Sequence, residues 1–251
     1  MNEEFRASIH KRLMAGDRSM AAKYSEIFPG RKGLWNLLKY EFIVSCVSGA
    51  PGALGYFLRK AFYPRLFKSV GRGCVFGRGI TIRHPHKISV GAGSFIDDGA
   101  VLDAKGAANE GIVIGENAYI GRNAILSCKE GSIFLGDYCN ISANCTILSE
   151  TEVRLGKYCF LAGNCYLVAG GNHSFADLAT PVMFQPSLAK GGIRIGDDVW
   201  LGAGVLVLDG VSIGGTSVVG AGSVVTGSIP EFSFARGVRQ LKIFDRRGPG
   251  A

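Results

Sequence analysis

The sequence predicts a mainly β protein in which short strands and turns wind into a solenoid of stacked coils. The first observation is a six-residue repeat that begins near residue 70 and continues to about residue 230. The second is the presence of 37 glycines among 251 residues without a three-residue collagen period, which indicates a turn that is used many times. The third is a long break in the repeat over residues 174–193. Together they predict one elongated domain with an appendage and a protruding loop.

Each repeat consists of an aliphatic residue, a small residue, two turn residues, a small or β-branched residue and a spacer. Val90-Gly-Ala-Gly-Ser-Phe and Ile195-Gly-Asp-Asp-Val-Trp are examples. The first and fifth positions can both point inward if each hexad forms one strand and one turn, so that three hexads close a triangular coil. Gly, Asn and Asp in the turn tolerate positive φ. About seven coils are predicted, with equivalent starts at residues 70, 90, 114, 135, 155, 195 and 213.

Residues 1–69 are predicted to form a separate helical segment. A short polar helix is expected over Glu3–Ala15, followed by a linker that ends at Pro29–Gly33. Leu34–Ser48 and Leu54–Phe67 carry apolar residues near helical spacing. Neither run is long and uncharged enough to predict a membrane span.

The positive charge of the chain is concentrated at its N-terminal end. The net charge is +8, and residues 1–72 hold 13 Lys and Arg against 5 Asp and Glu, which leaves 15 against 15 in the rest. A nucleic-acid-binding protein more often carries a basic stripe on its main fold, interleaved with exposed aromatic residues. We therefore expect an anionic membrane surface or a phosphate-bearing substrate as partner, and no nucleic acid.

The seven cysteines do not predict a disulfide framework or a zinc site, since no CxxC pair exists. Five of them fall four residues after a repeat start and are expected to fill one stacked row as small hydrophobic residues: Cys74, Cys139, Cys145, Cys159 and Cys165. Unpaired thiols favour a reducing cytoplasm. Met1–Met20 also lacks the apolar core of a signal peptide. We expect a cytoplasmic protein, with a peripheral position on the inner membrane surface as a further option.

The break in the repeat carries the candidate catalytic residue. Gly170-Gly171-Asn172-His173-Ser174-Phe175 contains a titratable side chain with a near-neutral reference pKa and precedes the turn-rich excursion Ala176–Gly192. A residue held on a rigid coil beside a protruding loop is well placed to present chemistry. His173 is therefore our candidate general base, although Asn-His at a turn is also compatible with turn formation alone.

The repeat resembles that of the hexapeptide-repeat acyltransferases. The resemblance covers residues 70 to about 243, and residues 155–230 are most similar to the galactoside, maltose and polysaccharide O-acetyltransferases. It rests on three runs: Ile195-Gly-Asp-Asp-Val-Trp-Leu-Gly-Ala-Gly-Val, Gly210-Val-Ser-Ile-Gly, and Val219-Gly-Ala-Gly-Ser-Val-Val-Thr with Ile229-Pro230. The family resemblance implies a left-handed parallel β-helix that assembles as a homotrimer with each active site between neighbours.

The resemblance also implies site residues, matched one by one. His173 takes the place of the family's general base, which removes a proton from an acceptor hydroxyl as that hydroxyl attacks a thioester. Asn164 matches an asparagine that contacts the acceptor or the developing oxyanion. A groove for the donor, acetyl-coenzyme A, is implied at Trp200, Gly202, Ala203, Ala221 and Thr226. No metal is implied.

Some positions depart from the family pattern. The segment Gly237-Val-Arg-Gln-Leu-Lys lacks the proline of the family's closing motif, so Arg239 and Lys242 are carried over as phosphate contacts by position alone. Gly227-Ser228 replaces a usual Lys-Asp pair. Asn164 shares its turn position with other asparagines of the repeat, so a purely structural role is nearly as well supported. Trp200 has an alternative too, because a tryptophan fills space in a protein more often than it lines a ligand groove.

We expect three segments: residues 1–69 as a helical segment, 70–230 as the β-helix with its loop at 174–193, and 231–251 as a tail. The predicted function is transfer of an acyl group, expected to be acetyl, from coenzyme A to a sugar hydroxyl in polysaccharide or glycolipid synthesis. One alternative is N-acylation of an amino sugar nucleotide or small metabolite. Another is a non-catalytic trimeric scaffold. A zinc carbonic anhydrase of similar fold is not expected, because the four histidines (His10, His84, His86 and His173) are too dispersed to converge on one metal.

Two surfaces are expected to make contacts outside the chain. Flat faces with exposed apolar residues such as Val205 and Leu206 are expected to pack in the trimer. Residues 34–68 combine aromatic residues, including Trp35 and Phe57, with five basic residues. This mixture favours helices lying in an anionic membrane interface. The alternative is that the same aromatic residues cap the open end of the coil stack.

Overall fold

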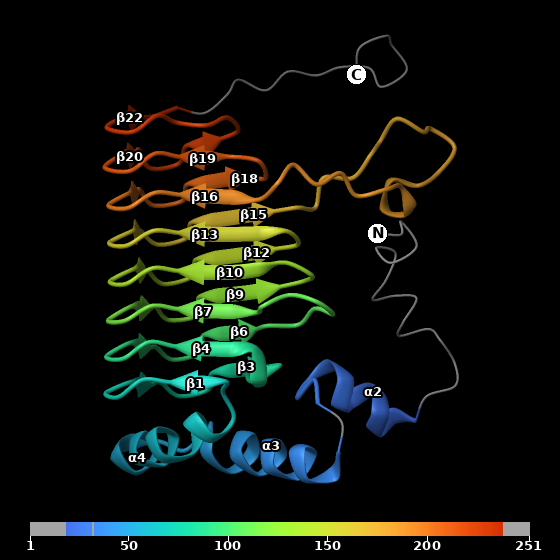
Figure 1. The fold of residues 1–251 in the computed structure, drawn as a ribbon, viewed down its shortest axis with the longest axis vertical. Helices are drawn as coiled ribbons and strands as arrows, with labels where there is room; N and C mark the ends of the chain where they lie inside the picture. Colours follow the sequence, from blue (N-terminus) through green and yellow to red (C-terminus); the bar gives the residue numbers. More distant parts are fainter. Residues whose placement is uncertain (1–18, 32, 238–251) are drawn as a thin grey trace.

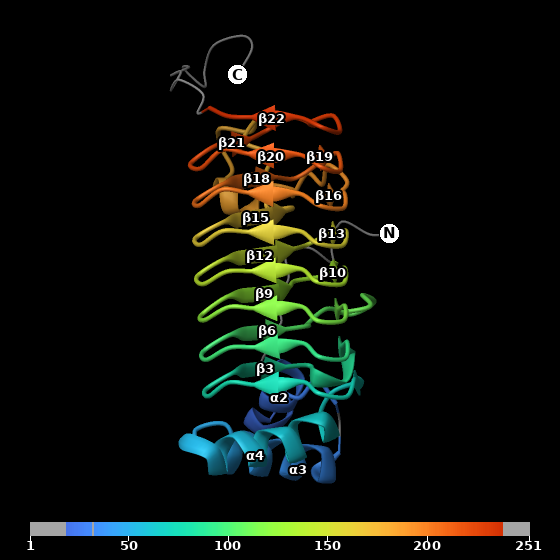
Figure 2. The same cartoon turned by 90° about the vertical axis from the view of Figure 1, so that its left-hand side faces the viewer.

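The structure, a computed structural model of the chain, describes residues 19–31 and 33–237 and is a parallel β-helix with helices at one end (Figure 1). Three sheets, called A, B and C here, form the sides of a triangular column. The chain passes through the sheets in that order, and every ladder is parallel. In Figure 2 the strands facing the viewer point left while successive coils rise toward the C-terminal end, so the coil is left-handed. The predicted fold class is confirmed.

The strands are short and each sheet takes one from every coil. Sheet A contains β1 (Ser69–Val70), β4 (Ile88–Val90), β7 (Ile112–Ile114), β10 (Ser132–Leu135), β13 (Glu152–Leu155), β16 (Ile193–Ile195) and β19 (Ser212–Ile213). Sheet B contains β2 (Val75–Phe76), β5 (Phe95–Ile96), β8 (Tyr119–Ile120), β11 (Asn140–Ile141), β14 (Phe160–Leu161), β17 (Trp200–Leu201), β20 (Val218–Val219) and β22 (Phe234–Ala235). Sheet C contains β3 (Thr81–Arg83), β6 (Val101–Asp103), β9 (Ile125–Cys128), β12 (Thr146–Ser149), β15 (Tyr166–Ala169), β18 (Leu206–Leu208) and β21 (Val224–Val225).

The predicted coil starts form one in-register row. Each is the last residue of a sheet A strand, and the row runs from Val70 paired with Val90 to Ile195 paired with Ile213. Beyond the seven predicted coils, Ile229 forms a bridge with Ile213, and β22 pairs with β20. The solenoid therefore extends past residue 230, where a tail was predicted to begin.

The turns adopt the expected positive φ, also at two tyrosines, a residue type that the turn rule did not predict. Asn117 and Asn164 have φ of 52° and 62°. Tyr138 and Tyr158 occupy the equivalent position with φ of 58° and 59°. Their rings stack on each other with centroids 5.2 Å apart. This contact between neighbouring coils stabilises two large side chains at a position that usually takes Gly or Asn.

The five cysteines predicted as fillers are all buried and unpaired. Each thiol donates a hydrogen bond to a backbone carbonyl in the next coil, at Sγ–O distances of 3.1 Å from Cys74, 3.0 Å from Cys139, 3.1 Å from Cys145, 3.1 Å from Cys159 and 3.2 Å from Cys165. The prediction of a single row is wrong: Cys74, Cys139 and Cys159 lie at the edge between sheets A and B, and Cys145 and Cys165 lie at the edge between sheets B and C. Both rows fill space and also link successive coils. Cys46, outside the repeat, is exposed.

The N-terminal segment contains three helices in its described part: α2 (Met20–Ile27), α3 (Leu34–Val47) and α4 (Gly52–Phe62), followed by the 3₁₀ turn η2 (Tyr63–Arg65). The sequence did not predict α2, whose first turn is capped by Ser19. The helix expected over Glu3–Ala15 lies outside the described residues. The run predicted over Leu54–Phe67 is helical only to Phe62, because Pro64 tightens the chain into η2. No helix in the described ranges has the length and apolarity to cross a bilayer.

The helices α3 and α4 cover the open end of the column with one face (Figures 1 and 2). Tyr40, Ile43 and Val47 of α3 are buried, and the Tyr40 hydroxyl donates to the Ile82 carbonyl over 2.6 Å. Arg59 of α4 is buried and donates from Nε to the Phe76 carbonyl over 2.9 Å. The first coil thus has its apolar end and its free carbonyls covered. Trp35 and Phe57 do not take part, since 84% and 62% of their surfaces are exposed.

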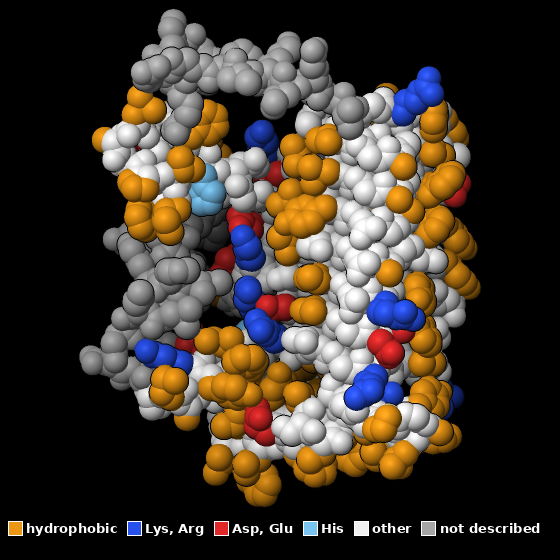
Figure 3. Space-filling view, turned by 180° about the vertical axis from the view of Figure 1, so that it is seen from behind, with side chains coloured by type: hydrophobic (Ala, Val, Ile, Leu, Met, Phe, Trp, Pro, Cys, Tyr) orange, Lys and Arg blue, Asp and Glu red, His pale blue; other side chains and the backbone are white. Residues whose placement is uncertain are grey.

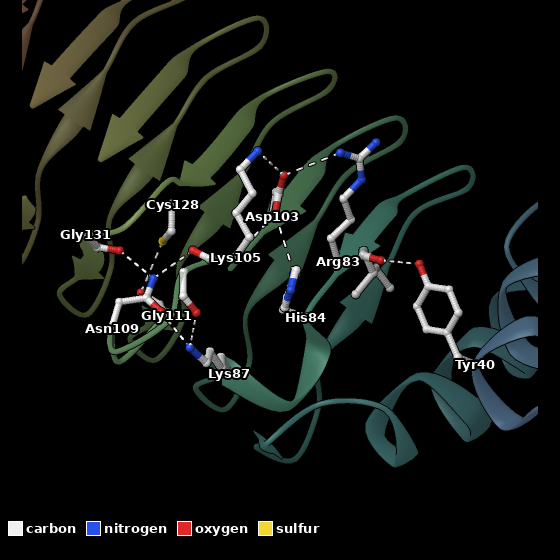
Figure 4. Close-up of polar contacts among 12 residues, drawn as sticks. Tyr40, Arg83, His84, Lys87, Asp103, Lys105, Asn109, Gly111, Cys128 and Gly131 are labelled. Atoms are coloured by element: carbon white, nitrogen blue, oxygen red, sulfur yellow. Dashed lines mark hydrogen bonds and ion pairs between the residues drawn. The ribbon is translucent and has the colours of Figure 1, made fainter. Parts of the chain in front are cut away.

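Charged side chains join the first coils along the edge between sheets C and A (Figure 4). Buried Asp103 lies 3.6 Å from Arg83, 3.2 Å from Lys105 and 4.0 Å from His84. Arg83 also lies over the ring of Phe28, which follows α2. Because a buried carboxylate needs compensating charge, this cluster holds the linker after α2 against the column. Nearby, η3 (Pro85–Lys87) places Lys87 Nζ 2.8 Å from Asn109.

Coil stacking can be tested at a glycine whose missing side chain is required. A Cβ on Gly136 would lie 2.5 Å from the backbone of Gly156 in the next coil. We expect Gly136→Ala to lower the free energy of unfolding by about 1–3 kcal/mol, because two coils would have to separate. Gly227→Ala is the control, since nothing lies within 4 Å of its Cβ position. It should change stability by less than about 0.5 kcal/mol. Denaturant unfolding measures both, and equal effects would contradict the close contact.

Candidate active site

The segment with His173 leaves the column at the edge between sheets C and A. The strand β15 ends at Ala169, and Gly170 and Gly171 follow with φ of 115° and 73°. These conformations favour glycine and turn the chain away from the next sheet A strand. The chain returns only at β16, so residues 170–192 form the protruding loop, close to the predicted 174–193 (Figure 1). His173 is exposed at the base of this loop.

The loop is fixed by its own hydrogen bonds. His173 and Ser187 form an antiparallel bridge, flanked by the Ser174 N–H donating to Pro186 over 2.8 Å. The buried Gln185 side chain donates to the Asp177 and Thr180 carbonyls over 2.7 and 2.8 Å. A short 3₁₀ turn, η4 (Val182–Phe184), precedes it. The backbone around His173 is therefore held as a small ladder.

One ring nitrogen of His173 is used by this ladder and the other is left for chemistry. Nδ1 lies 3.2 Å from the Gln185 carbonyl oxygen. Because a carbonyl only accepts, this contact assigns the proton of the neutral ring to Nδ1. Nε2 then carries the lone pair and has no partner among the described residues. This tautomer is the one that a general base needs.

A carboxylate lies beneath His173 in the preceding coil. Glu150 accepts from the Gly171 N–H over 2.9 Å and from Lys129 Nζ over 2.6 Å. Burial alone would raise the pKa of Glu150, but Lys129 and the Gly171 N–H outweigh burial, and with a contribution from His173 they lower it. Glu150 is therefore ionised and adds negative charge next to the imidazole.

The base of the loop is fixed by a second carboxylate. Asp209, buried in the following coil, accepts from the backbone of Lys190 over 2.7 Å and of Gly192 over 2.8 Å. It also accepts from the Asn172 side chain over 3.3 Å. Both ends of the loop are thus tied to one buried group, which fixes where His173 stands above the column.

The residues implied for the donor groove lie mainly along another edge, between sheets B and C. Trp200 lies in the outward row of sheet B between Phe160 and Val218 and is 49% exposed. Its ring stacks on Phe160 with centroids 6.3 Å apart. Gly202 follows in the turn, where a Cβ would lie 2.6 Å from the Ala221 nitrogen of the next coil. Ala203 and Ala221 are exposed. Small side chains along this edge leave the backbone open to a ligand.

The structure divides the predicted site residues between two edges. Asn164 precedes β15 and lies at the edge of Gly202 and Ala203, whereas His173 follows β15 at the opposite edge of sheet C. One chain therefore does not bring Asn164 beside His173. Thr226 follows β21 and lies at the His173 edge, apart from Trp200. Arg239 and Lys242 lie outside the described residues.

Sequence reasoning missed Lys129, Glu150, Gln185 and Asp209. Lys129, Glu150 and Gln185 lie outside the six-residue pattern, and Asp209 occupies an ordinary turn position of a hexad. A signal was nevertheless available, because the extra residues of several coils all fall at the edge between sheets C and A, after β6, β9, β12 and β15. In Figure 3 a histidine side chain is visible at the surface, next to apolar side chains of the loop. Acidic and basic side chains lie below it in a vertical row.

The other described histidines belong to the cap. His84 contacts Asp103, and its backbone N–H donates to the Phe28 carbonyl over 2.8 Å. The rings of His84 and His86 are 6.2 Å apart. Within residues 19–31 and 33–237, no group of three or more His, Cys, Asp or Glu side chains is placed to hold a metal ion.

Comparison with known proteins agrees with this fold. Residues 192–227 match the family described as bacterial transferase hexapeptide (six repeats), and residues 111–149 match the hexapeptide repeat of succinyl-transferase. A Mycobacterium tuberculosis protein described as a "probable acetyltransferase" is 31% identical over 166 residues, which is 66% of this chain and 54% of that protein. The galactoside O-acetyltransferase of Lactococcus lactis is 35% identical over 124 residues, 47% of this chain and 55% of that protein.

The chain thus spans about half the length of the relatives that it matches. Among solved structures, an N-acyltransferase from Bacillus cereus in complex with dTDP and 3-hydroxybutyryl-CoA is 21% identical, covering 72% of this chain and 85% of that one with a TM-score of 0.46. Both family matches fall on coils whose register the structure displays, β7 to β12 and β16 to β21. By these two repeat matches and by its relatives, this chain is similar to the hexapeptide-repeat transferases.

Proposed function

We propose that this protein is a coenzyme-A-dependent acyltransferase that transfers an acetyl group to a sugar hydroxyl in polysaccharide or glycolipid synthesis. The observation that carries the proposal is His173, whose Nδ1 contacts the Gln185 carbonyl so that Nε2 is available as a base. The names of the matched relatives, an acetyltransferase and a galactoside O-acetyltransferase, support the reaction class. Acetyl-coenzyme A is the donor substrate in this proposal, and the acceptor is a glycan.

The proposed reaction needs no nucleophile on the enzyme. Nε2 of His173 takes the proton of the acceptor hydroxyl as its oxygen attacks the thioester carbonyl carbon. The C–S bond then breaks, and the imidazolium returns the proton to the leaving thiolate of coenzyme A. Glu150 stabilises the imidazolium while it exists, because its ionised carboxylate lies next to the ring. An N–H donor from Asn164 of a neighbouring chain is proposed to assist the oxyanion.

Geometry supports an active site made by two chains. His173 stands at one edge of sheet C, and Trp200, Gly202, Ala203 and Ala221 stand at or beside the other. If three copies of sheet C surround a three-fold axis, each His173 edge faces the opposite edge of the next chain. His173 and the residues of the other edge belong to neighbouring coils, so they would meet at similar heights along the axis. We propose that the donor lies in this groove between chains.

The outer face of sheet C supports this assembly. Its outward side chains form in-register apolar rows, which include Ile125, Tyr166, Leu206 and Val224 in one row and Leu148, Val168 and Leu208 in the other. Leu206 is half-buried in the single chain, as expected for such a face. Val205 was expected there too, and that expectation is wrong. It is fully buried inside the coil because the fifth hexad position points inward.

The first prediction concerns the base. His173→Ala should lower kcat by about two to four orders of magnitude, the usual contribution of a general base. The side chain is exposed, so folding and acetyl-coenzyme A binding should change little. Steady-state kinetics across a panel of glycan and amine acceptors, with calorimetry for donor binding, measures both. Near wild-type turnover in the variant would refute the assignment of His173 as the general base. If the wild-type protein did not bind acetyl-coenzyme A, the alternative of a non-catalytic scaffold would be favoured.

The second prediction concerns Glu150. In Glu150→Gln the hydrogen bond from Gly171 can persist while the negative charge beside His173 is lost. We expect kcat to fall by about tenfold with little change in KM, because the imidazolium that forms during the reaction loses a neighbouring negative charge. Glu152→Gln is the control, since Glu152 pairs with Arg154 on sheet A. Equal effects of the two substitutions would remove Glu150 from the mechanism.

The third prediction concerns assembly. Light scattering should give a mass of about three times 26.6 kDa. His173→Ala and Ala203→Trp should each be inactive alone, the first lacking the base and the second blocking the groove. Refolding them together should restore about a quarter of the sites, because a site is intact when its two edges come from the right pair of chains. An active monomer, or no recovery in mixed trimers, would contradict a shared site.

A further inference from the structure

The lower end of the molecule contains a basic cavity that the proposed reaction does not use. It has a volume of about 270 Å³ and lies between α3, η2 and the first coil. Its charged lining consists of Arg31, Lys39, Arg65 and Lys68, with His86 at its wall. No acidic residue lines it. A hollow with four cations and no carboxylate is suited to an anion.

The cations of this cavity are not neutralised by the described part of the chain. None of the four forms an ion pair there, and Glu41, the only acidic residue of 34–68, accepts instead from the Tyr24 hydroxyl over 2.6 Å. Burial, with the nearby Arg31 and His84, lowers the pKa of His86 to about 4, so its ring is neutral at pH 7. Its Nδ1 is buried without a hydrogen-bond partner among the described residues. The cavity therefore contains four cations without ion pairs and a ring nitrogen without a hydrogen-bond partner among the described residues, and an anion with polar oxygens would satisfy both.

An apolar surface adjoins the cavity. Trp35, Leu38 and Phe42 of α3 follow the spacing i, i+3, i+7 and are exposed by 84%, 49% and 55%. They lie opposite the buried Tyr40, Ile43 and Val47, which cap the column. On α4, Leu54 and Phe57 are exposed by 69% and 62%. Figure 3 shows apolar side chains gathered along this end of the molecule.

We propose that this end docks on a membrane containing anionic phospholipid, with a lipid phosphate in the basic cavity and the exposed side chains of α3 and α4 in the interface. Lys39 lies on α3 between the outward Leu38 and the buried Tyr40, so a headgroup bound there has its acyl chains beside the apolar stripe. Insertion of a few apolar side chains alone, or attraction of a few cations alone, binds a protein to a membrane only weakly. The two contributions together give stable binding.

A soluble phosphate compound explains less of the surface. It would account for the cavity but not for the apolar stripes on two adjacent helices, which cost free energy when left in water. Charge complementarity points to the same partner, because residues 34–68 hold five basic residues against one acidic residue. This inference is independent of the proposed reaction, since none of these residues contacts the loop of His173.

The test uses the full chain and vesicles of phosphatidylcholine with and without phosphatidylglycerol. Sedimentation should show binding only to the anionic vesicles, weakened by salt. In a Trp200→Phe background Trp35 is the remaining tryptophan, and its emission should shift to the blue when anionic vesicles are added. Binding to neither vesicle, or a Trp35 spectrum that does not move, would overturn the proposal.

Matched variants separate the two parts of the surface. Lys39→Ala with Lys68→Ala should weaken partitioning by roughly 30-fold, since each basic residue near anionic lipid contributes about a factor of five. Arg122→Ala with Lys157→Ala removes the same charge from exposed turns of the column and should weaken it far less. Trp35→Ser with Phe57→Ser should also abolish sedimentation while leaving the thermal midpoint nearly unchanged, because both side chains are exposed.

Two further measurements identify another occupant if the proposal is wrong. Titration with inorganic phosphate and glycerol 3-phosphate, followed by calorimetry, reports a soluble ligand of the cavity. Saturable binding of these compounds without vesicle binding would assign the cavity to a soluble phosphate compound. Light scattering of Trp35→Ser with Phe57→Ser reports self-association. A change of oligomeric mass in that variant, with no vesicle binding by the wild-type protein, would make this face an interface between copies.

Discussion

The direct stacking of one hexad on the next is the interaction on which the whole molecule depends. Successive coils lie about 4.8 Å apart, the spacing of hydrogen-bonded strands. At several second positions of the hexad only glycine fits, because a Cβ on Gly91, Gly115 or Gly136 would lie within 2.4–2.6 Å of backbone in the next coil. The sheets therefore cannot absorb extra residues. Insertions leave the column at its edges, and nearly all of the polar apparatus is found there.

The edge between sheets C and A shows how a repetitive scaffold acquires a site. A rigid ladder presents the same backbone in every coil, so the residues that make one coil chemically different from the others have to lie outside the ladder. Here the loop after β15 carries His173, and groups from the coils on both sides hold it. Glu150 binds it from the coil before and Asp209 from the coil after. Both carboxylates act through backbone N–H groups, whose positions are fixed by the stacking.

The ends of a solenoid raise a different physical problem, since the first and last coils have no neighbour on one side. At the N-terminal end α3 and α4 supply apolar cover, and Tyr40 and Arg59 donate to carbonyls of the first coil that a preceding coil would otherwise bond. A helix that buries only one stripe normally exposes a polar stripe on its other side. These two helices instead expose Trp35, Phe42 and Phe57. The sequence offered capping and membrane contact as alternatives, and the structure assigns capping to one face while the other remains free for contact.

The sequence alone determined the solenoid, because a period of six with glycine or asparagine in the turn has one compact solution. It located the seven predicted coil starts, the burial of the repeat cysteines and the loop with His173, since each either matches the repeat or interrupts it. The cysteines form two rows and not the single row predicted, because the fifth hexad position recurs at more than one edge of the coil. It misplaced Val205 on the outer face, although Val205 holds the fifth position of its hexad, which the repeat itself predicts to point inward. It also missed Glu150 and Asp209, which act through contacts between coils, and Gln185, which acts through contacts within the loop. Only the tertiary structure decided that Asn164 and His173 lie on opposite edges of sheet C, because the strand β15 (Tyr166–Ala169) runs between them and holds their side chains apart.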